Sequence, residues 1–276
     1  QSYWTKGLVK NTNTGTNYYK IQDAIDNASA GDTLNVWAWI YYEALEIDES
    51  ISIIGNASST TKIIAGSGQY NSDLDSVIEI TSDDVTLRNL TIIQNATNFT
   101  YGVKSDNDDI TISNNIIDYW TSSAYGKTAL YASGDNFVIS NNSIYEAEHC
   151  IQLTESDGTL VENNIFGRDS STSEPSKCFF QLYLSDNNII KNNTFTDSRY
   201  GFSLSSSSSN LVSDNKIIKD LAYEKGGIRL SGTSTNNQII NNTVSGYESG
   251  IESRADLNYF SGNVLDDNHY GISFKD

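Results

Sequence analysis

The sequence contains no methionine, one proline, two cysteines and two histidines in 276 residues. Because no initiator methionine is present, Gln1 is typical of a mature end left by removal of a signal peptide, and we expect an exported protein. The scarcity of proline is compatible with long β-ladders, which need the backbone N–H groups that proline lacks. No run of about 18 apolar residues occurs, so we expect no membrane-spanning segment.

Basic residues are also scarce. The chain has 17 Lys and Arg against 35 Asp and Glu, which gives a formal net charge of −18. A surface of this sign repels phosphate backbones and anionic lipids, so we exclude nucleic acid and membrane surfaces as partners. The excess of acidic residues is explained by solubility alone. The alternative is a protein that binds cations or functions at high salt concentration.

What the sequence does have is a repeat. Residues 137–144 read FVISNNSI, and similar segments recur along the chain at intervals of 21 to 29 residues. Such a variable period indicates stacked supersecondary units. The position of Asn141 is filled in successive copies by Asn89, Asn114, Asn141, Asn163, Asn192, Asp214, Asn241 and Gly262.

The columns of this repeat predict a buried asparagine ladder. The positions two before and three after Asn141 are apolar in every copy, and the position directly after it is almost always asparagine. A buried amide must be hydrogen-bonded, and it carries both donors and an acceptor, so each can bond its neighbours above and below. Asparagine also tolerates the left-handed backbone of a tight turn. We expect a ladder at a corner of each coil, made by Asn115, Asn142, Asn164, Asn193, Asn215, Asn242 and Asn263.

A second strand follows most copies of the repeat, as in 101–103 (YGV), 227–230 (GIRL) and 270–272 (YGI). Alternation predicts that every other residue points inward. We expect the recurrent glycine to lie where the chain turns with positive φ. The fold class is therefore all-β, a single right-handed parallel β-helix.

The N-terminal region differs from the repeats. Residues 1–17 are polar and are interpreted as an arm, with a linker or a partial cap as alternatives. Apolar residues at helical spacing predict a short α-helix over about 18–28 that covers the first coil, and residues 18–276 form the β-helix domain. Trp37 and Trp39 are interpreted as packing under this cap, the alternative being a sugar-binding platform.

These repeats resemble the right-handed parallel β-helix superfamily, the pectin-lyase-like fold, over about residues 18–276. The Asn-Asn-Thr-Val and Tyr-Gly-Ile-Ser segments, and the block from 21 to 55, are most similar to NosD-like repeats of archaeal surface proteins. The superfamily includes lyases, hydrolases and non-catalytic surface proteins, so the resemblance implies the fold and leaves function open. The copper link of the NosD name is not carried over, because soft copper sites need Met, Cys or His.

Two kinds of covalent modification are expected. Eight Asn-x-Ser/Thr sequons occur, and four of them, at Asn89, Asn141, Asn192 and Asn241, occupy the position beside the ladder, where the side chain should face water and accept a glycan. Cys150 and Cys178 fall on adjacent coils but one residue out of register. Two interpretations remain: a disulfide between these cysteines, or two thiols that pack separately.

No catalytic constellation stands out. Lys104 and Arg229 hold similar second-strand positions but lie five coils apart, roughly 24 Å at about 4.8 Å per strand, too far to share a substrate carbon. His149 with its neighbouring glutamates, and His269 with its neighbouring aspartates, are interpreted as surface turns. The acidic run that contains Asp106, Asp108 and Asp109 offers oxygen ligands for Ca²⁺, with a solvated turn as the alternative.

We therefore expect a non-catalytic, extracellular or cell-surface structural protein, a glycosylated archaeal subunit of an envelope layer, sheath or filament that self-associates head-to-tail or laterally. Cell-surface glycans are candidate partners, and no cofactor other than Ca²⁺ is expected. The alternative is an extracellular polysaccharide lyase or hydrolase, or a carbohydrate-binding β-helix. A convergent groove of basic, acidic and aromatic residues over three neighbouring coils would favour that alternative, and the sequence alone reveals no such groove.

Overall fold

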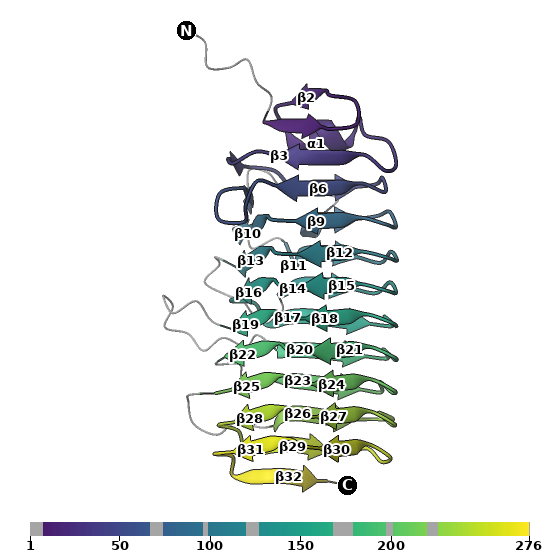
Figure 1. Ribbon diagram of the computed structural model, residues 1–276, viewed down its shortest axis with the longest axis vertical. Coiled ribbons are helices and arrows are strands. Elements are labelled where there is room, and N and C mark those ends of the chain that lie inside the picture. Colours follow the sequence, from purple (N-terminus) through teal and green to yellow (C-terminus); the bar gives the residue numbers. More distant parts are fainter. Residues whose placement is uncertain are drawn as a thin grey trace.

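The computed structural model describes residues 8–66, 74–95, 99–119, 127–167, 179–196, 201–219 and 226–275. Over these residues the chain winds into a stack of coils, and strands β3 to β32 repeat in threes (Figure 1). Each coil adds one strand to each of three sheets, and neighbouring coils pair in parallel. The predicted all-β parallel β-helix is confirmed.

The first sheet, called sheet A, carries the residues just before the asparagine corner. Its strands are β3 (Thr33–Val36), β6 (Ser52–Gly55), β9 (Thr86–Arg88), β12 (Thr111–Ser113), β15 (Val138–Ser140), β18 (Leu160–Glu162), β21 (Ile189–Lys191), β24 (Leu211–Ser213), β27 (Gln238–Ile240) and β30 (Tyr259–Ser261).

Sheet B follows the corner. Its strands are β4 (Ile40–Tyr41), β7 (Lys62–Gly66), β10 (Thr91–Asn95), β13 (Ile116–Tyr119), β16 (Ser143–Tyr145), β19 (Ile165–Gly167), β22 (Thr194–Thr196), β25 (Lys216–Ile218), β28 (Thr243–Ser245) and β31 (Val264–Asp266).

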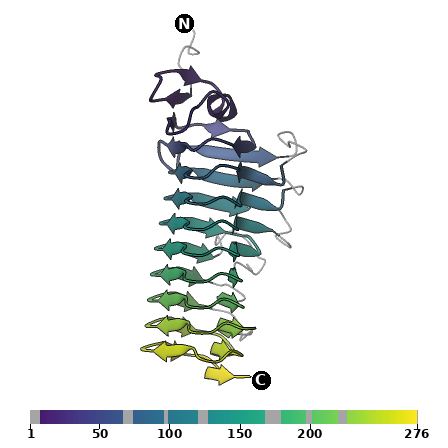
Figure 2. The same ribbon diagram turned by 90° about the vertical axis from the view of Figure 1, so that its right-hand side faces the viewer.

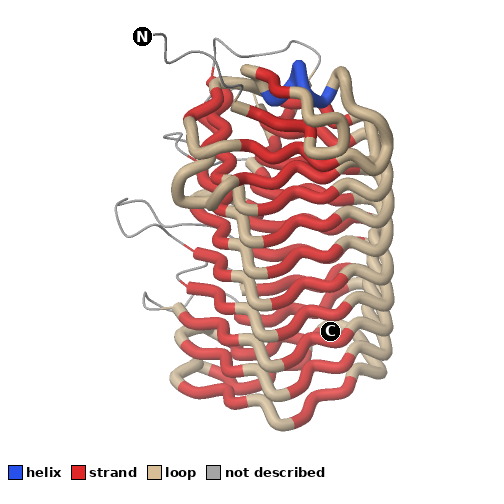
Figure 3. The backbone as a smooth tube through the Cα atoms, turned by 45° about the horizontal axis from the view of Figure 1, so that its top comes forward, coloured by secondary structure: helices blue, strands red, loops and turns tan. Residues whose placement is uncertain are grey.

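Sheet C contains the strand predicted to follow the repeat. Its members are β5 (Leu45–Ile47), β8 (Ser76–Ile80), β11 (Tyr101–Ser105), β14 (Thr128–Ala132), β17 (His149–Thr154), β20 (Phe179–Tyr183), β23 (Phe202–Ser205), β26 (Gly226–Ser231), β29 (Ser249–Ser253) and β32 (Tyr270–Phe274). The corners between the sheets align along the stack, as the tan segments in Figure 3 show.

The asparagine ladder lies at the corner between sheets A and B, as predicted. The backbone N–H of Asn142 donates to Oδ1 of Asn164 at 2.8 Å, and the N–H of Asn164 donates to Oδ1 of Asn193 at 2.9 Å. Both amides are buried. The residue before each ladder member has a positive φ, 56° at Asn141 and 55° at Asn192, which places its side chain outside. The predicted inside–outside register is confirmed.

Two further ladders were not predicted, and both lie at the corner between sheets C and A. In the first, the N–H of Asn188 donates to Oδ1 of Asn210 at 2.8 Å, and the same pattern continues along the column. In the second, the N–H of Ser185 donates to the buried Oγ of Ser207 at 3.0 Å. The serine-rich run 205–209 therefore supplies a buried ladder residue, Ser207.

The reason expected for the sheet C glycines is wrong. Gly102, Gly227 and Gly250 do not have positive φ. A Cβ on Gly102 would lie 2.6 Å from the carbonyl oxygen of Ala129, and one on Gly227 would lie 2.3 Å from Cγ1 of Val244. These glycines are needed because the next coil and the opposite wall come too close for a side chain.

At the N-terminal end, the helix is shorter than predicted: α1 spans Ile21–Ile25 and lies at that end of the stack (Figure 2). Three of its residues, all apolar, are buried. Residues before it extend sheet A in the antiparallel sense, through β1 (Val9–Asn11) paired with β3, and β2 (Asn17–Tyr18) paired with β1. Trp37 and Trp39 are 40% and 54% exposed, so the interpretation that they pack under the cap is wrong.

The last coil is exposed at the opposite end of the stack. Ile272 lies in register with the buried Ile251 but is 41% exposed, and Phe274 is 72% exposed. That a second copy covers this coil stays a prediction.

Cys150 is buried on β17 and disulfide-bonded, while Cys178 lies outside the described residues.

Candidate functional site

The outward positions at the centre of the sheet C strands form one row in register, which we call the sheet C row. The pairing places each member directly opposite the next on adjacent parallel strands. From β8 to β29 it runs through Glu79, Lys104, Tyr131, Gln152, Gln181, Ser203, Arg229 and Glu252. Because inward neighbours of each member fill the core, the row is held on a rigid base.

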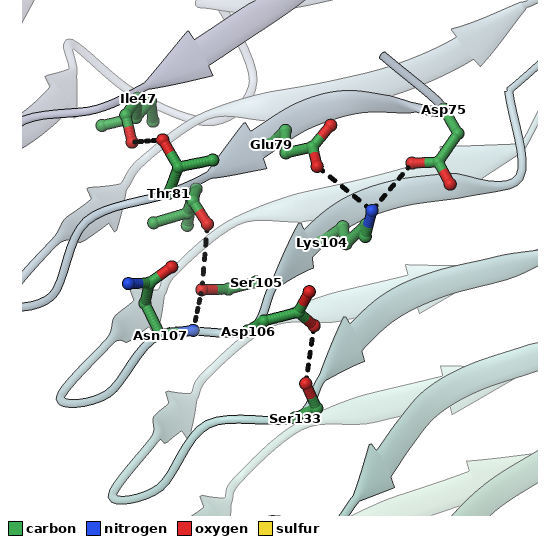
Figure 4. A network of polar contacts seen from close by, with 10 residues as sticks. Ile47, Asp75, Glu79, Thr81, Lys104, Ser105, Asp106, Asn107 and Ser133 are labelled. Carbon is green, nitrogen blue, oxygen red and sulfur yellow. Dashed lines mark hydrogen bonds and ion pairs between the residues drawn. The ribbon is translucent and has the colours of Figure 1, made fainter. Parts of the chain in front are cut away.

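One end of the row joins acids, a cation and aromatic rings across three neighbouring strands. Nζ of Lys104 lies 3.1 Å from Oε1 of Glu79 and 3.3 Å from Oδ1 of Asp75 (Figure 4). The same ammonium lies 5.8 Å from the ring centroid of Tyr101, whose ring meets that of Tyr131 at 5.1 Å. Sequence analysis did not place these acids, this cation and these rings beside one another.

The charge state of this cluster argues against a lysine base. Partial burial alone would lower the pKa of Lys104, but the hydrogen bond and charge of Glu79, with those of Asp75, outweigh it and raise the pKa. Burial, followed by the Asp75 carboxylate, also raises the pKa of Tyr101. A general base must release its proton near the working pH. Lys104 is therefore a fixed cation, and Tyr101 stays a neutral hydroxyl.

The middle of the row is uncharged. Tyr131, Gln152, Gln181 and Ser203 follow one another on β14, β17, β20 and β23, and all are half-buried. Gln152 donates weakly to Oγ1 of Thr154 at 3.4 Å, and the described part of the chain gives the Gln181 amide no hydrogen-bond partner. The row therefore presents amide and hydroxyl groups that can bind a ligand.

The far end of the row is a second neutralised charge cluster. The Glu252 carboxylate is almost fully buried and contacts Arg254 Nε at 3.0 Å, Lys275 Nζ at 3.0 Å and Arg229 Nη2 at 3.4 Å. Arg229 and Lys104 are separated by five steps in the strand order of sheet C, as predicted. The two cations therefore cannot act on one substrate atom.

This cluster predicts a pH dependence of stability. Burial alone would raise the pKa of Glu252, but the Lys275 hydrogen bond and the Arg229 and Lys275 charges lower it below its ordinary 4.5. A carboxylate with a lowered folded-state pKa stabilises the fold fully above its unfolded pKa, and that contribution is lost as the pH falls through the folded value. We expect the stability gap between the wild type and Glu252→Gln in urea unfolding to shrink below about pH 4.5.

The control for this measurement is Glu162→Gln. It removes the 3.1 Å contact with Lys191 on sheet A, where both partners are more exposed than Glu252. Exposed pairs contribute about 0–1 kcal/mol, so this variant should stay close to the wild type. A gap that remains constant down to pH 3 would contradict the role of Glu252.

The other residues singled out from the sequence do not converge. His149 begins β17, and the His269 ring meets the edge of Tyr270 at 4.4 Å. Asp106 accepts from Ser133 Oγ at 2.6 Å, whereas Asp108 accepts from the N–H of Asp135 at 2.8 Å. Asp109 occupies a left-handed turn position. Among the residues described, no group of three or more His, Cys, Asp or Glu side chains is placed to hold a metal ion.

The residues that form the row were missed, although a signal existed. In 151–153 (IQL), 180–182 (FQL) and 202–204 (FSL), two apolar residues flank one polar residue. Sequence analysis used this alternation only to place the inward residues.

Within the described ranges, no helix has the length and apolar character needed to cross a bilayer.

Three parallel sheets around one apolar core, with a polar row along one face, define a β-solenoid. The chain belongs to the right-handed β-helix region family, which matches residues 76–244 and 129–276 of its sequence. No curated protein matches the sequence.

Solved structures share the fold at low identity. DFA-IIIase from Arthrobacter chlorophenolicus A6 in complex with DFA-III has a TM-score of 0.57 at 13% identity over 83% of this chain and 65% of that one. Dettilon tailspike protein (gp208) has a TM-score of 0.54 at 15% identity over 92% of this chain and 64% of that one. The A-module of mannuronan C-5 epimerase AlgE6 from Azotobacter vinelandii has a TM-score of 0.46 at 13% identity over 91% of this chain and 89% of that one, a score too low to support an argument. The chain thus spans just under two thirds of the first two proteins, and these identities establish the fold alone.

Proposed function

We propose that the protein binds an uncharged polysaccharide along the sheet C row. The observation that carries this proposal is the cluster of Glu79, Lys104 and Tyr131 on three neighbouring strands, continued by neutral amides and a hydroxyl. Tyrosine offers an apolar face and a polar tip, which suits a sugar ring with both kinds of surface. The row would bind an extended chain because its groups repeat at about 4.8 Å along a straight line.

The charges favour a neutral ligand. A uronate chain needs cations that are free to bind carboxylates, yet Lys104 is engaged by two carboxylates and Arg229 by Glu252. The net charge of −18 further disfavours an anionic polymer. The fold is shared with a carbohydrate-active enzyme, DFA-IIIase, which supports the ligand class without assigning a site.

The proposal assigns binding without cleavage. Lys104 holds its proton, and Asp75 and Glu79 both face the same ammonium. A glycoside hydrolase places its two carboxyl groups on either side of the scissile bond, whereas these two carboxylates contact one ammonium together.

The test uses two glutamine variants and one matched control. Gln152→Ala and Gln181→Ala should each weaken binding of a neutral polysaccharide about 2–10-fold in isothermal titration, because each removes one or two modest hydrogen bonds. Gln238→Ala makes the same change on the outward face of sheet A and should leave the dissociation constant unchanged. Xylan, mannan, cellulose and fructan fragments are the neutral probes, and pectate and alginate are the charged ones.

Three results would overturn this proposal. One is binding of pectate or alginate in preference to every neutral probe. Another is an equal effect of the sheet A and sheet C variants. The third is release of new reducing ends or unsaturated products. Unfolding midpoints of all three variants check that a loss of binding is not a loss of structure.

A structural role at the cell surface is the second candidate. It is favoured by the exposed Ile272 and Phe274 of β32, which a second copy would cover. Head-to-tail contact of this kind propagates into filaments or rings. The two functions are compatible, but only glycan binding is sensitive to changes in the sheet C row.

A further inference from the structure

The corner between sheets A and B carries a row of exposed asparagines, independent of the sheet C row. Asn141, Asn192 and Asn241 each precede a ladder residue and have φ of 55° to 56°. Their side chains are exposed, and within the described residues none of the three amides has a hydrogen-bond partner. The ladder asparagine that follows each of them is buried, so the exposed amide is held on a rigid turn.

These three positions fall on alternate coils. The sheet A order places β15, β18, β21, β24 and β27 side by side, so Asn141, Asn192 and Asn241 are each two strands apart. The spacing is roughly 10 Å at about 4.8 Å per strand. The coils between them carry Asn163 and Asp214 at the same corner.

The residue two places later alternates in the same way. It begins each sheet B strand and points outward, and Ser143, Thr194 and Thr243 follow the three exposed asparagines. On the intervening strands the in-register positions are Ile165 and Lys216. The need for positive φ explains Asn, Asp or Gly at each corner, but it does not explain a hydroxyl on every second strand.

We propose that this corner is a modification site, with N-linked glycans on Asn141, Asn192 and Asn241. The donor is a lipid diphosphate-linked glycan. The Asn Nδ2–C1 bond forms as the C1–O bond to the lipid diphosphate breaks, and the amide proton leaves to a base of the transferase. The two-coil spacing separates neighbouring glycans. Glycans on adjacent coils, about 4.8 Å apart, would be crowded.

The same geometry separates these sites from other sequons. Asn89 is only half-buried rather than exposed, and the hydroxyl of its sequon partner Thr91 is buried and donates to the carbonyl oxygen of Ser58. The Asn27 amide donates to the carbonyl oxygen of Asp23 at 2.8 Å. Asn89 and Asn27 should therefore be modified less than the three corner sites.

The test is glycopeptide mass spectrometry on the protein from its natural source and on variants secreted by a host that performs N-glycosylation. Ser143→Ala, Thr194→Ala and Thr243→Ala each destroy one sequon while keeping asparagine at the left-handed turn. Each should lower the intact mass by one glycan. Thr196→Ala, on the same strand as Thr194, removes a hydroxyl without affecting a sequon and should lose no glycan.

Unmodified peptides at all three corner sites in the native protein would overturn the proposal. So would an occupancy at Asn27 and Asn89 equal to that at the corner, because exposure of the amide and its lack of a hydrogen-bond partner would then not determine the site. Loss of glycan in Thr196→Ala would show that strand integrity, and not the sequon, controls the mass change.

Discussion

Replacing Asn164 by leucine should lower the free energy of unfolding by about 2–6 kcal/mol. The substitution leaves two buried backbone groups without hydrogen-bond partners, at a cost of about 1–3 kcal/mol each. Oδ1 of Asn164 accepts from the backbone N–H of Asn142 at 2.8 Å, and Nδ2 donates to the carbonyl oxygen of Ile139 at 2.8 Å. Leucine can satisfy neither group. Equilibrium unfolding in urea measures the loss.

The matched control is Asn163→Gly, one residue earlier on the same turn. Asn163 has φ 56° and an exposed side chain, and glycine adopts this backbone without strain. We expect a change of less than about 1 kcal/mol. If Asn163→Gly proved the more damaging of the two, the buried column would not be the ladder.

Gly227→Val should destabilise the fold by about 1–3 kcal/mol or more, as overpacking of a dense core does. Its Cβ would lie 2.3 Å from Cγ1 of Val244 and 3.0 Å from the carbonyl oxygen of Gly250. Val244 is fully buried and β-branched, so it has little rotamer freedom to move aside. The thermal midpoint should fall in parallel with the urea midpoint.

Gly271→Val provides the control in the same column, since β29 and β32 pair in register. The nearest atom to its Cβ is Cδ1 of Leu265 at 3.9 Å, an ordinary contact. This variant should unfold close to the wild type. Equal destabilisation by the two substitutions would mean that strand propensity, rather than close approach, determines the cost.

The periodic part of the fold could be predicted because its causes recur in every coil. Asn164 and its equivalents must be buried and bonded together, and the corner before them requires a left-handed backbone. The serine ladder through Ser207 escaped notice because hydroxyls are common in polar turns. The close approach at Gly227 depends on Val244 across the core, which a single strand does not reveal.

The candidate site was harder to predict than the fold. The separation of Lys104 and Arg229 followed from counting coils, and it is confirmed. The partners of Lys104 did not follow, because Asp75 and Glu79 lie on the preceding coil, 29 and 25 residues earlier in the sequence. Trp37 and Trp39 were assigned inward because aromatic burial was assumed, whereas their segment leaves the strand after β3.

The ladder also gives the stack a direction. In the rungs described above, the backbone N–H belongs to the earlier coil and the accepting Oδ1 to the later one, as from Asn142 to Asn164. The side-chain Nδ2 of Asn164 donates the opposite way, to the carbonyl oxygen of Ile139. During synthesis from the N-terminus, each finished coil therefore carries a buried N–H whose acceptor has not yet been made. The coil made most recently therefore has an open N–H donor until the next coil is in place.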